Sequence, residues 1–306
     1  MRVAAIDVGT NSTRLLVAED QAHGFRALDR RMVITRLGQG VDRRRLISPT
    51  ALERTVRVIA DYVAACGEYG VERVRVTGTS AVRDARNRDE FFTAVRALTG
   101  APPELLTGEE EARITYLGAT SDLDRSHPIL VCDIGGGSTE LIYGRQEPGA
   151  LVSLDVGCVR MFEKHLMSDP PADSELDALR AEVRRDLGRA RSELPAAPGT
   201  KLVGVAGTVA QLAVLKTGIP VYDPDVTHHA VMTHGDVRLL AKRLESLRYD
   251  ERKRIKGLEE GRADVIVAGA EILLAVLDVF DLPEVTASEK DILDGLVLGL
   301  LDGAGA

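Results

Sequence analysis

The sequence predicts an α/β protein built from two similar lobes, and three observations support this. A short motif occurs twice, as Asp7–Leu15 and as Asp133–Leu141. Each copy follows an apolar run typical of a buried strand, and a similar series of expected strands and helices follows each copy. Both copies share the pattern Asp-(Val/Ile)-Gly-x-x-Ser-Thr-x-Leu, which favours an internal duplication over chance.

Composition excludes several classes of protein. The chain has 306 residues, enough for two domains, with 44% hydrophobic and 28% charged residues, as in ordinary globular proteins. No apolar run approaches membrane-spanning length, the N-terminus has no signal-peptide layout, and the three cysteines form no CxxC pair. We therefore expect a cytoplasmic protein with reduced thiols. A net charge of −8 argues against nucleic-acid binding but leaves room for a polyanionic substrate in a local basic cleft.

The second copy of the motif has the chemistry of a phosphate site. Apolar runs at 129–132 and 141–143 predict two strands joined by a turn of three glycines. Successive amides in such a turn form an anion-binding nest, whereas Asp133 and Glu140 beside it would repel an anion. A divalent cation between them, Mg²⁺ in the first instance, resolves the conflict. The alternative is an ordinary glycine-rich hairpin.

The first segment continues with strands near 14–19 and 25–37. A helix is expected from Pro49, capped by Ser48, because apolar residues recur there at helical spacing. A strand at 71–76, a short helix near 89–98, a strand near 105–106 and a helix from Gly108 or Glu109 follow.

The second segment repeats this order with extra helices. Strands are expected near 141–143, 150–155, 202–205 and 285, and helices near 157–167, 173–193, 208–216, 235–247, 262–279 and from 290. The two lobes are expected at 1–124 and 125–306, with the last helix, 290–306, a candidate to pack back on the first. Opposed phosphate hairpins would place the active site in a cleft between the lobes.

The chain resembles the exopolyphosphatase/guanosine pentaphosphate phosphatase (Ppx/GppA) family of the actin-like superfamily. The resemblance covers nearly the whole chain. The segments that carry it are Asp7–Ser12, Thr79–Arg83, Gly108–Arg113, Asp133–Glu140, Ala206–Thr208, and Arg262–Asp264 with Gly269.

This resemblance implies two actin-like (ribonuclease H-like) lobes with an active-site cleft between them, and a chain of the short two-domain form. It implies a hydrolase that releases terminal phosphate from inorganic polyphosphate, or from guanosine pentaphosphate (pppGpp). It also implies a homodimer.

The resemblance assigns catalytic roles to three carboxylates. Glu111 corresponds to the family's catalytic base, although three consecutive glutamates at a helix start ordinarily complement the helix dipole. Asp133 and Glu140, together with Glu111, are the expected ligands of Mg²⁺ or Mn²⁺.

Further residues are expected to bind phosphate. The turn residues are Gly9, Thr10, Asn11, Ser12, Gly135, Gly136, Gly137, Ser138 and Thr139. Arg14 and Arg83 are candidate phosphate clamps, with surface salt bridges as the alternative. Gly207 and Thr208 match a loop that in the superfamily lies near a nucleotide or a later phosphate.

Two groups of charged residues are assigned no part in the site. Arg30–Arg31 and Arg43–Arg45 are interpreted as a solvated face. His228, His229 and His234 match no strong zinc spacing.

Alternative functions stay open from the sequence. A pppGpp 5′-phosphatase would share every catalytic residue with an exopolyphosphatase. A non-hydrolysing alarmone-binding protein is disfavoured by the intact carboxylates, and an actin-fold kinase by the lack of an acceptor motif.

Overall fold

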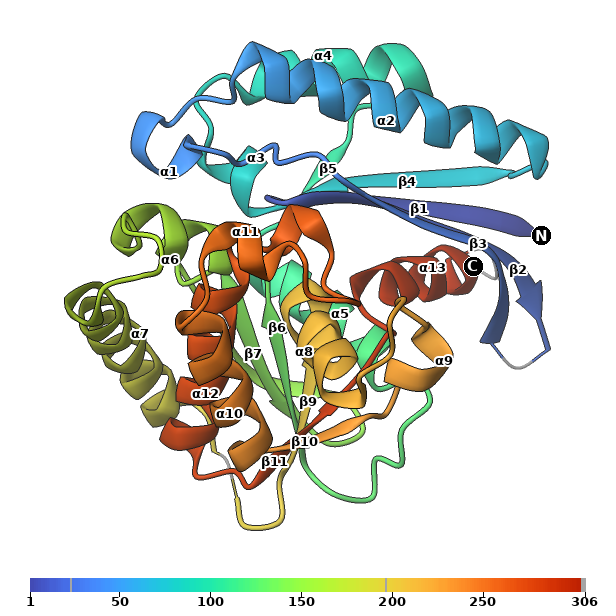
Figure 1. Ribbon diagram of the computed structural model, residues 1–306. Helices are drawn as coiled ribbons and strands as arrows, with labels where there is room; N and C mark the ends of the chain where they lie inside the picture. The colour runs from blue at the N-terminus through green and yellow to red at the C-terminus, as the bar shows by residue number, and fades with distance from the viewer. Residues whose placement is uncertain (23, 196, 304–306) are drawn as a thin grey trace. The chain divides into compact units, whose positions relative to one another are not determined.

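A computed structural model describes residues 1–22, 24–195 and 197–303 of the chain. The chain divides into two compact units (Figure 1). Unit 1 comprises Met1–Gly118 and the C-terminal segment from Ile292, and unit 2 comprises Ala119–Asp291. The first crossing between the units therefore lies earlier than the expected boundary after residue 124, and the last helix belongs to unit 1.

The sheet of unit 1 has the order β3-β2-β1-β4-β5. The first three strands form an antiparallel meander, and the other two run parallel to β1. Their bounds are β1 Arg2–Val8, β2 Ser12–Gln21, β3 Gly24–Ile34, β4 Arg73–Gly78 and β5 Glu104–Leu105.

Both faces of this sheet are covered because side chains alternate along β1. Ala4, Ile6 and Val8 pack with α2 and α4, whereas Val3 and Ala5 pack with α13. Figure 1 shows α2 and α4 on one side of the sheet and α13 on the other. The helices of unit 1 are α1 Val41–Arg44, α2 Pro49–Glu68, α3 Ser80–Asp84, α4 Arg88–Thr99, α5 Gly108–Ala119 and α13 Ile292–Asp302.

The sheet of unit 2 repeats this topology, with the order β10-β11-β9-β6-β7-β8. Strands β6, β7 and β8 form the antiparallel meander, β9 and β11 run parallel to β6, and β10 adds an antiparallel edge. The bounds are β6 Ile129–Ile134, β7 Thr139–Gly144, β8 Pro148–Leu154, β9 Lys201–Val205, β10 Val231–Thr233 and β11 Glu284–Ala287. The predicted α/β class and the repetition are confirmed.

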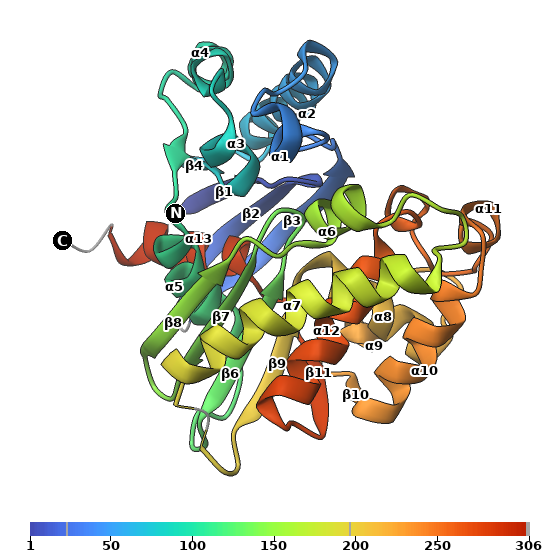
Figure 2. The same ribbon diagram turned by 90° about the vertical axis from the view of Figure 1, so that its left-hand side faces the viewer.

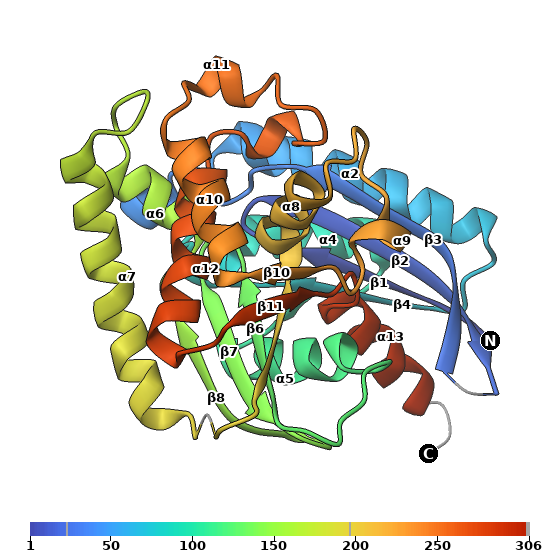
Figure 3. The ribbon, with the colours of Figure 1, turned by 60° about the horizontal axis from the view of Figure 1, so that its bottom comes forward.

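The core of unit 2 lies between this sheet and a layer of helices. Figure 2 shows α7 crossing in front of the sheet, and Figure 3 shows α12 between α7 and α10. Apolar residues of β6, α7, α8, α10 and α12 form one cluster. The helices are α6 Cys158–His165, α7 Asp173–Glu193, α8 Ala206–Thr217, α9 Pro224–Thr227, α10 His234–Glu245, α11 Tyr249–Arg252 and α12 Ile266–Phe280, with a 3₁₀ turn, Glu260–Arg262.

The long elements agree with the sequence-based expectations. Helix α2 begins at Pro49, and the Ser48 hydroxyl accepts a hydrogen bond from the Ala51 amide at 3.2 Å. The short elements α1, α3, α9, β10 and α11 were not predicted. None of the helices in the described ranges combines the length and the apolar character needed to cross a bilayer.

Candidate active site

The two repeated motifs form the same tight turn. The amide of Gly9 donates to the carbonyl of Ser12 at 3.0 Å, and the amide of Gly135 donates to the carbonyl of Ser138 at 3.0 Å. A side chain at either glycine would approach the serine carbonyl, at 3.3 Å for Gly9 and 3.1 Å for Gly135. The shared frame in the sequence therefore corresponds to shared backbone geometry.

In unit 1, the carbonyl groups of the turn are bound by the segment that follows β3. Arg36 donates its amide to Asn11 at 2.8 Å, and Gly38 donates to Thr10 at 2.9 Å. The Asn11 side chain is 7% exposed, and its amide nitrogen has no hydrogen-bond partner among the described residues. A buried donor without a partner is costly unless a ligand satisfies it. This turn therefore carries a donor suited to a phosphate oxygen.

In unit 2, the start of α6 supports the glycine turn in the equivalent way. The amide of Cys158 donates to Gly135 at 2.9 Å, and those of Val159 and Arg160 donate to Gly136 at 2.9 and 3.0 Å. Nε of the buried Arg160 donates to the carbonyl of Gly137 at 2.7 Å. These bonds occupy the carbonyl groups of the turn.

The close packing of α6 against the glycine turn explains why residue 157 is glycine. A Cβ at Gly157 would lie 2.4 Å from the carbonyl oxygen of Gly136 and 2.5 Å from the carbonyl carbon of Gly137. No side chain fits there, so α6 can reach the turn only through a glycine.

The residues that face each other at the strand ends distinguish the two hairpins. Asp7 pairs with Arg14 across β1 and β2, and the guanidinium lies 2.7 Å from the carboxylate. Asp133 pairs with Glu140 at the same register across β6 and β7. Arg14, predicted to clamp phosphate, thus neutralises Asp7. The corresponding pair in unit 2 brings two acids together.

The two acids of unit 2 are both buried, Asp133 at 7% and Glu140 at 1% exposure. The Ser153 hydroxyl donates to Glu140 at 2.7 Å. Burial raises the pKa of the neighbouring Cys132 thiol well above its ordinary value, and the charges of Asp133 and Glu140 raise it further. Two buried carboxylates at one register favour a shared cation or proton. Oxygen ligands of this kind fit Mg²⁺ or Mn²⁺.

The three consecutive glutamates of α5 have different environments. The Glu110 carboxylate accepts hydrogen bonds from the amide and hydroxyl of Thr107 at 2.8 and 2.9 Å and caps the helix, and Glu109 is exposed. Glu111 is 9% exposed, and its carboxylate accepts a hydrogen bond from Nη1 of Arg83 at 3.3 Å. Two residues predicted for the site, Glu111 and Arg83, are therefore brought together.

The third predicted loop lies at the start of α8. Ala206 has φ 66°, a left-handed conformation that is strained for alanine. A Cβ at Gly207 would lie 2.0 Å from the guanidinium of Arg262, so this buried arginine lies directly against the Gly207 backbone. The sequence marked Arg262 as a motif residue but gave it no role in the site.

Two predicted phosphate ligands have side chains that are enclosed by the protein. The hydroxyl of Thr139 donates to the carbonyl of Val156 at 2.5 Å, and the side chain is fully buried. Thr208 is 2% exposed, and a Cβ at Gly269 would lie 2.6 Å from its methyl group. The side chains of both threonines hold the loops from inside.

The arginines that were assigned to a solvated face are mostly engaged. Arg30 contacts the buried Asp294 of α13 at 2.7 Å, Arg31 contacts Asp29 at 2.6 Å, and Arg45 lies 3.5 Å from Asp84. Their role in the described structure is intramolecular pairing.

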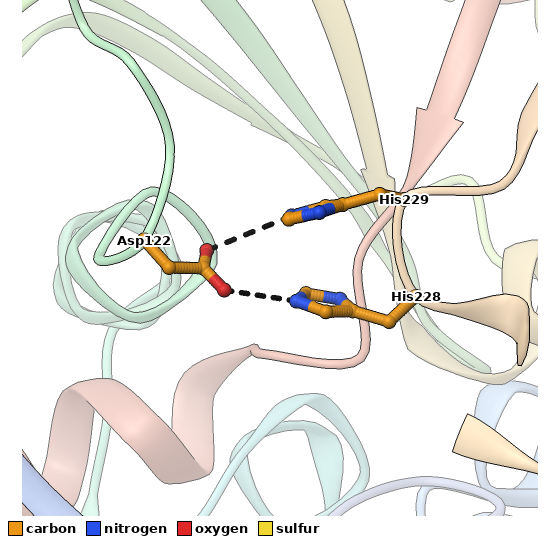
Figure 4. A group of neighbouring side chains, drawn as sticks. All are labelled: Asp122, His228 and His229. Atoms are coloured by element: carbon orange, nitrogen blue, oxygen red, sulfur yellow. Dashed lines mark hydrogen bonds and ion pairs between the residues drawn. The ribbon is translucent and has the colours of Figure 1, made fainter. Parts of the chain in front are cut away.

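Two of the histidines that were set aside meet an acid far away in the sequence (Figure 4). Nε2 of His228 lies 2.8 Å from Asp122, and that of His229 lies 3.8 Å from the same carboxylate. Nδ1 of His228 accepts the amide of Glu289 at 3.1 Å, so Nε2 carries the proton of the neutral ring and donates to Asp122. Lys290 also contacts Asp122 at 3.1 Å.

This cluster has a donor set that metals accept, with two imidazoles and one carboxylate. The proton on Nε2 and the ammonium of Lys290 instead indicate a hydrogen-bonded ion-pair network. His234 is separate and contacts Asp278 at 2.6 Å.

Arg160, Arg262 and Asp122 are the residues that sequence reasoning missed. Arg160 is not part of the repeated frame, and no local pattern distinguishes it from a surface arginine. Arg262 could have been identified more easily, because it lies in one of the segments that carry the family resemblance. Asp122 meets a histidine 106 residues away, a pairing that no spacing rule reveals.

Comparisons with known proteins identify relatives along the whole chain. A sequence model of the Ppx/GppA phosphatase family matches residues 16–304. Exopolyphosphatase 2 of Mycobacterium tuberculosis is 39% identical, with 98% of each chain covered. A crystal structure of the Aquifex aeolicus Ppx/GppA family member has a TM-score of 0.85 at 30% identity, covering 100% of this chain and 99% of that one. An exopolyphosphatase from Cytophaga hutchinsonii has a TM-score of 0.92 at 25% identity, covering 99% and 98%. The expected actin-like lobes are confirmed.

Proposed function

Because the chain belongs to the Ppx/GppA phosphatase family, we propose that it is an exopolyphosphatase that removes the terminal phosphate of inorganic polyphosphate. The observation that carries this proposal is the tight turn built twice, once beside an acid–arginine pair and once beside two buried acids. The substrate class is supported by the M. tuberculosis relative, which is named an exopolyphosphatase and aligns over 98% of the chain.

In the proposed reaction, water attacks the terminal phosphorus and the bridging P–O bond breaks. The Glu111 carboxylate accepts a proton from this water, and the shortened polyphosphate leaves with the bridging oxygen. Arg83, which donates to Glu111 at 3.3 Å, orients the carboxylate. Such chemistry depends mainly on positioning and charge stabilisation.

The turns supply donors for phosphate oxygens. In unit 1 these are the Gly9 to Ser12 turn and the buried amide of Asn11, which lacks a partner among the described residues. In unit 2 they are the backbone amides at 136–138, whose neighbouring carbonyl groups are bound by α6 and Arg160. We assign Arg262, which lies against Gly207, to a more distant phosphate of the chain.

Asp133 and Glu140 fit a divalent cation, Mg²⁺ or Mn²⁺, because two buried carboxylates face each other at one register and supply oxygen ligands. When bound, the ion would neutralise phosphate charge. Removal of divalent ions with EDTA is expected to abolish phosphate release, and Mg²⁺ is expected to restore it.

Phosphate release from defined substrates tests the proposal. The purified protein would be incubated with Mg²⁺ and polyphosphates of defined length, pppGpp or ATP. We expect release from polyphosphate. Release from pppGpp alone would replace the proposal with a pppGpp 5′-phosphatase, the other activity of the family, and release from none would indicate a non-hydrolysing binding protein.

A pair of substitutions within the first turn of α5 tests the base. Glu111→Gln is expected to lower the turnover number by about 10²–10⁴-fold, the usual contribution of a positioned base. Glu109→Gln is the control, since Glu109 lies in the same turn of α5 and is exposed. Unchanged turnover in Glu111→Gln would reject the assignment of the base.

A further inference from the structure

Unit 2 contains a groove formed by elements other than those that carry its glycine turn. It has a volume of about 430 Å³. Helix α12 forms the floor, and α7 and α10 form the two walls, because both pack on α12 (Figures 1 and 3). A cavity of this size suits a small ligand.

The walls present four basic side chains in two matched pairs. Arg180 and Arg184 lie one turn apart on α7, and Arg238 and Lys242 lie one turn apart on α10. Arg184 is mostly exposed and lies 3.2 Å from Asp278. Arg238 and Lys242 form no ion pair within the part of the chain that the structure describes. These two cations are available to an anion in the groove.

Acidic groups lie at the floor. Glu271 is 3% exposed, and Nε of Arg180 lies 2.5 Å from it. Nη2 of the same arginine lies 2.8 Å from Glu245, so one guanidinium contacts both carboxylates. Burial, with the Glu271 contact, raises the pKa of Glu245 to about 7.

We propose that this groove binds a small phosphorylated anion through Arg238, Lys242 and Arg184, and that Glu245 takes up a proton when the anion binds. Clustered arginines match phosphate because the planar guanidinium binds two oxygens at once. Proton uptake follows because a second negative charge beside Glu245 disfavours its ionised form. The site is independent of the proposed catalytic residues.

Charged groups from all three helices face Glu245 and set its titration. They are Asp177, Arg180, Arg184, Arg238, Lys242, Glu271 and Asp278. Burial and the neighbouring Glu271 raise the pKa of Glu245 to about 7, so we assign Glu245 as the proton acceptor. Suppose that anion binding raises the titration midpoint of Glu245 by one pH unit. The affinity for the anion is then about tenfold higher at a pH below the midpoints of the free and bound protein than at a pH above both.

Carbon-13 NMR of protein labelled at glutamate δ-carbons measures this titration directly. Glu245→Gln assigns the signal, and pyrophosphate without divalent ions serves as the probe. We expect a midpoint near 7 in the free protein and a rise with saturating pyrophosphate. Pyrophosphate bound only at the catalytic turns would leave the Glu245 midpoint unchanged, and this result would overturn the proposal.

Two double variants localise the effect. Arg238→Ala/Lys242→Ala is expected to abolish the rise in midpoint. Arg243→Ala/Lys256→Ala removes the same charge from exposed positions outside the groove and is expected to retain the rise. A rise that persists in the first variant, or disappears equally in both, would contradict the proposed site. Thermal unfolding verifies that each variant is folded, and Lys242→Ala alone replaces the first variant if it is not.

Discussion

One residue difference separates the chemistry of the two hairpins. Arg14 and Glu140 occupy the same position of the repeated frame, and each faces an aspartate across the strands. The arginine makes the first hairpin electrically neutral at this point. The glutamate leaves the second with two buried acids, whose repulsion a divalent ion would relieve. The metal requirement we propose therefore follows from a single side chain.

Gly157→Ala tests whether close contact with α6 shapes the glycine turn. A Cβ there would lie 2.4 Å from the Gly136 carbonyl oxygen, so the turn must move. We expect a loss of about 1–3 kcal/mol in the free energy of unfolding, with a lower turnover number on polyphosphate. Urea unfolding and phosphate release measure the two effects.

Gly188→Ala is the matched control for this substitution. A Cβ at Gly188 meets nothing within 4 Å, and the residue lies inside α7. Alanine there is expected to stabilise the protein by about 0.5–1 kcal/mol, with turnover unchanged. Normal stability and activity in Gly157→Ala would show that the turn does not depend on this contact.

Among the elements, α13 illustrates how a glycine permits close packing. Gly295 approaches α5 so closely that a Cβ would lie 2.0 Å from the Ile114 carbonyl oxygen. Leu293, Leu296 and Val297 of the same helix cover one face of β1 and β2. A displaced α13 would therefore expose this apolar face.

Gly295→Ala is expected to lower the free energy of unfolding by about 1–3 kcal/mol, because backbone rather than a flexible side chain blocks the methyl group. Gly299→Ala, one turn later, meets only the end of Arg75 at 3.6 Å and is expected to be tolerated. Thermal unfolding of both variants compares them. Equal melting temperatures would show that α13 is not held by this contact.

The long elements could be predicted because their signals are local. Helix α2 has a cap, a proline and an apolar stripe, and the repeated frame specifies two hairpins. The short elements depend on partners elsewhere. Strand β10, three residues long, forms only because β11 offers it an edge more than fifty residues later.

The candidate site was predictable to the same extent. Its hairpins and Glu111 lie in contiguous motifs, whereas Arg160 reaches Gly137 from a following helix. The sequence alone left the role of Arg14 open between a phosphate clamp and a salt bridge. The strand register decides it, because it places Arg14 opposite Asp7. Contacts that depend on tertiary packing could not be predicted from the spacing of residues in the sequence.

At the scale of the whole molecule, Glu245 makes stability depend on pH. Its pKa is raised from the ordinary 4.5 to about 7, so the folded state favours the protonated form. The stabilisation is fully present below pH 4.5 and is lost as the pH rises through about 7. Glu245→Gln cannot ionise and should become more stable than the wild type above pH 7, by up to a few kcal/mol, since each pKa unit corresponds to about 1.4 kcal/mol.

Urea unfolding between pH 5 and pH 8 measures this difference. Glu53→Gln, at an exposed position of α2, is the control and should follow the wild-type profile. Parallel profiles for the wild type and Glu245→Gln would show that Glu245 has the ordinary pKa of a glutamate and would contradict the prediction.

The ion pair between Asp122 and Lys290 has a consequence for how the polypeptide could be divided. Unit 2 is one uninterrupted segment of the chain. Asp122 lies near the start of this segment and Lys290 near its end, so their 3.1 Å contact holds the two ends of unit 2 together. Residues 119–291 thus have the character of an insertion that could be excised as a separate gene product. Residues 1–118 could not be isolated in the same way, because the helix that covers β1 and β2 is encoded beyond the insertion.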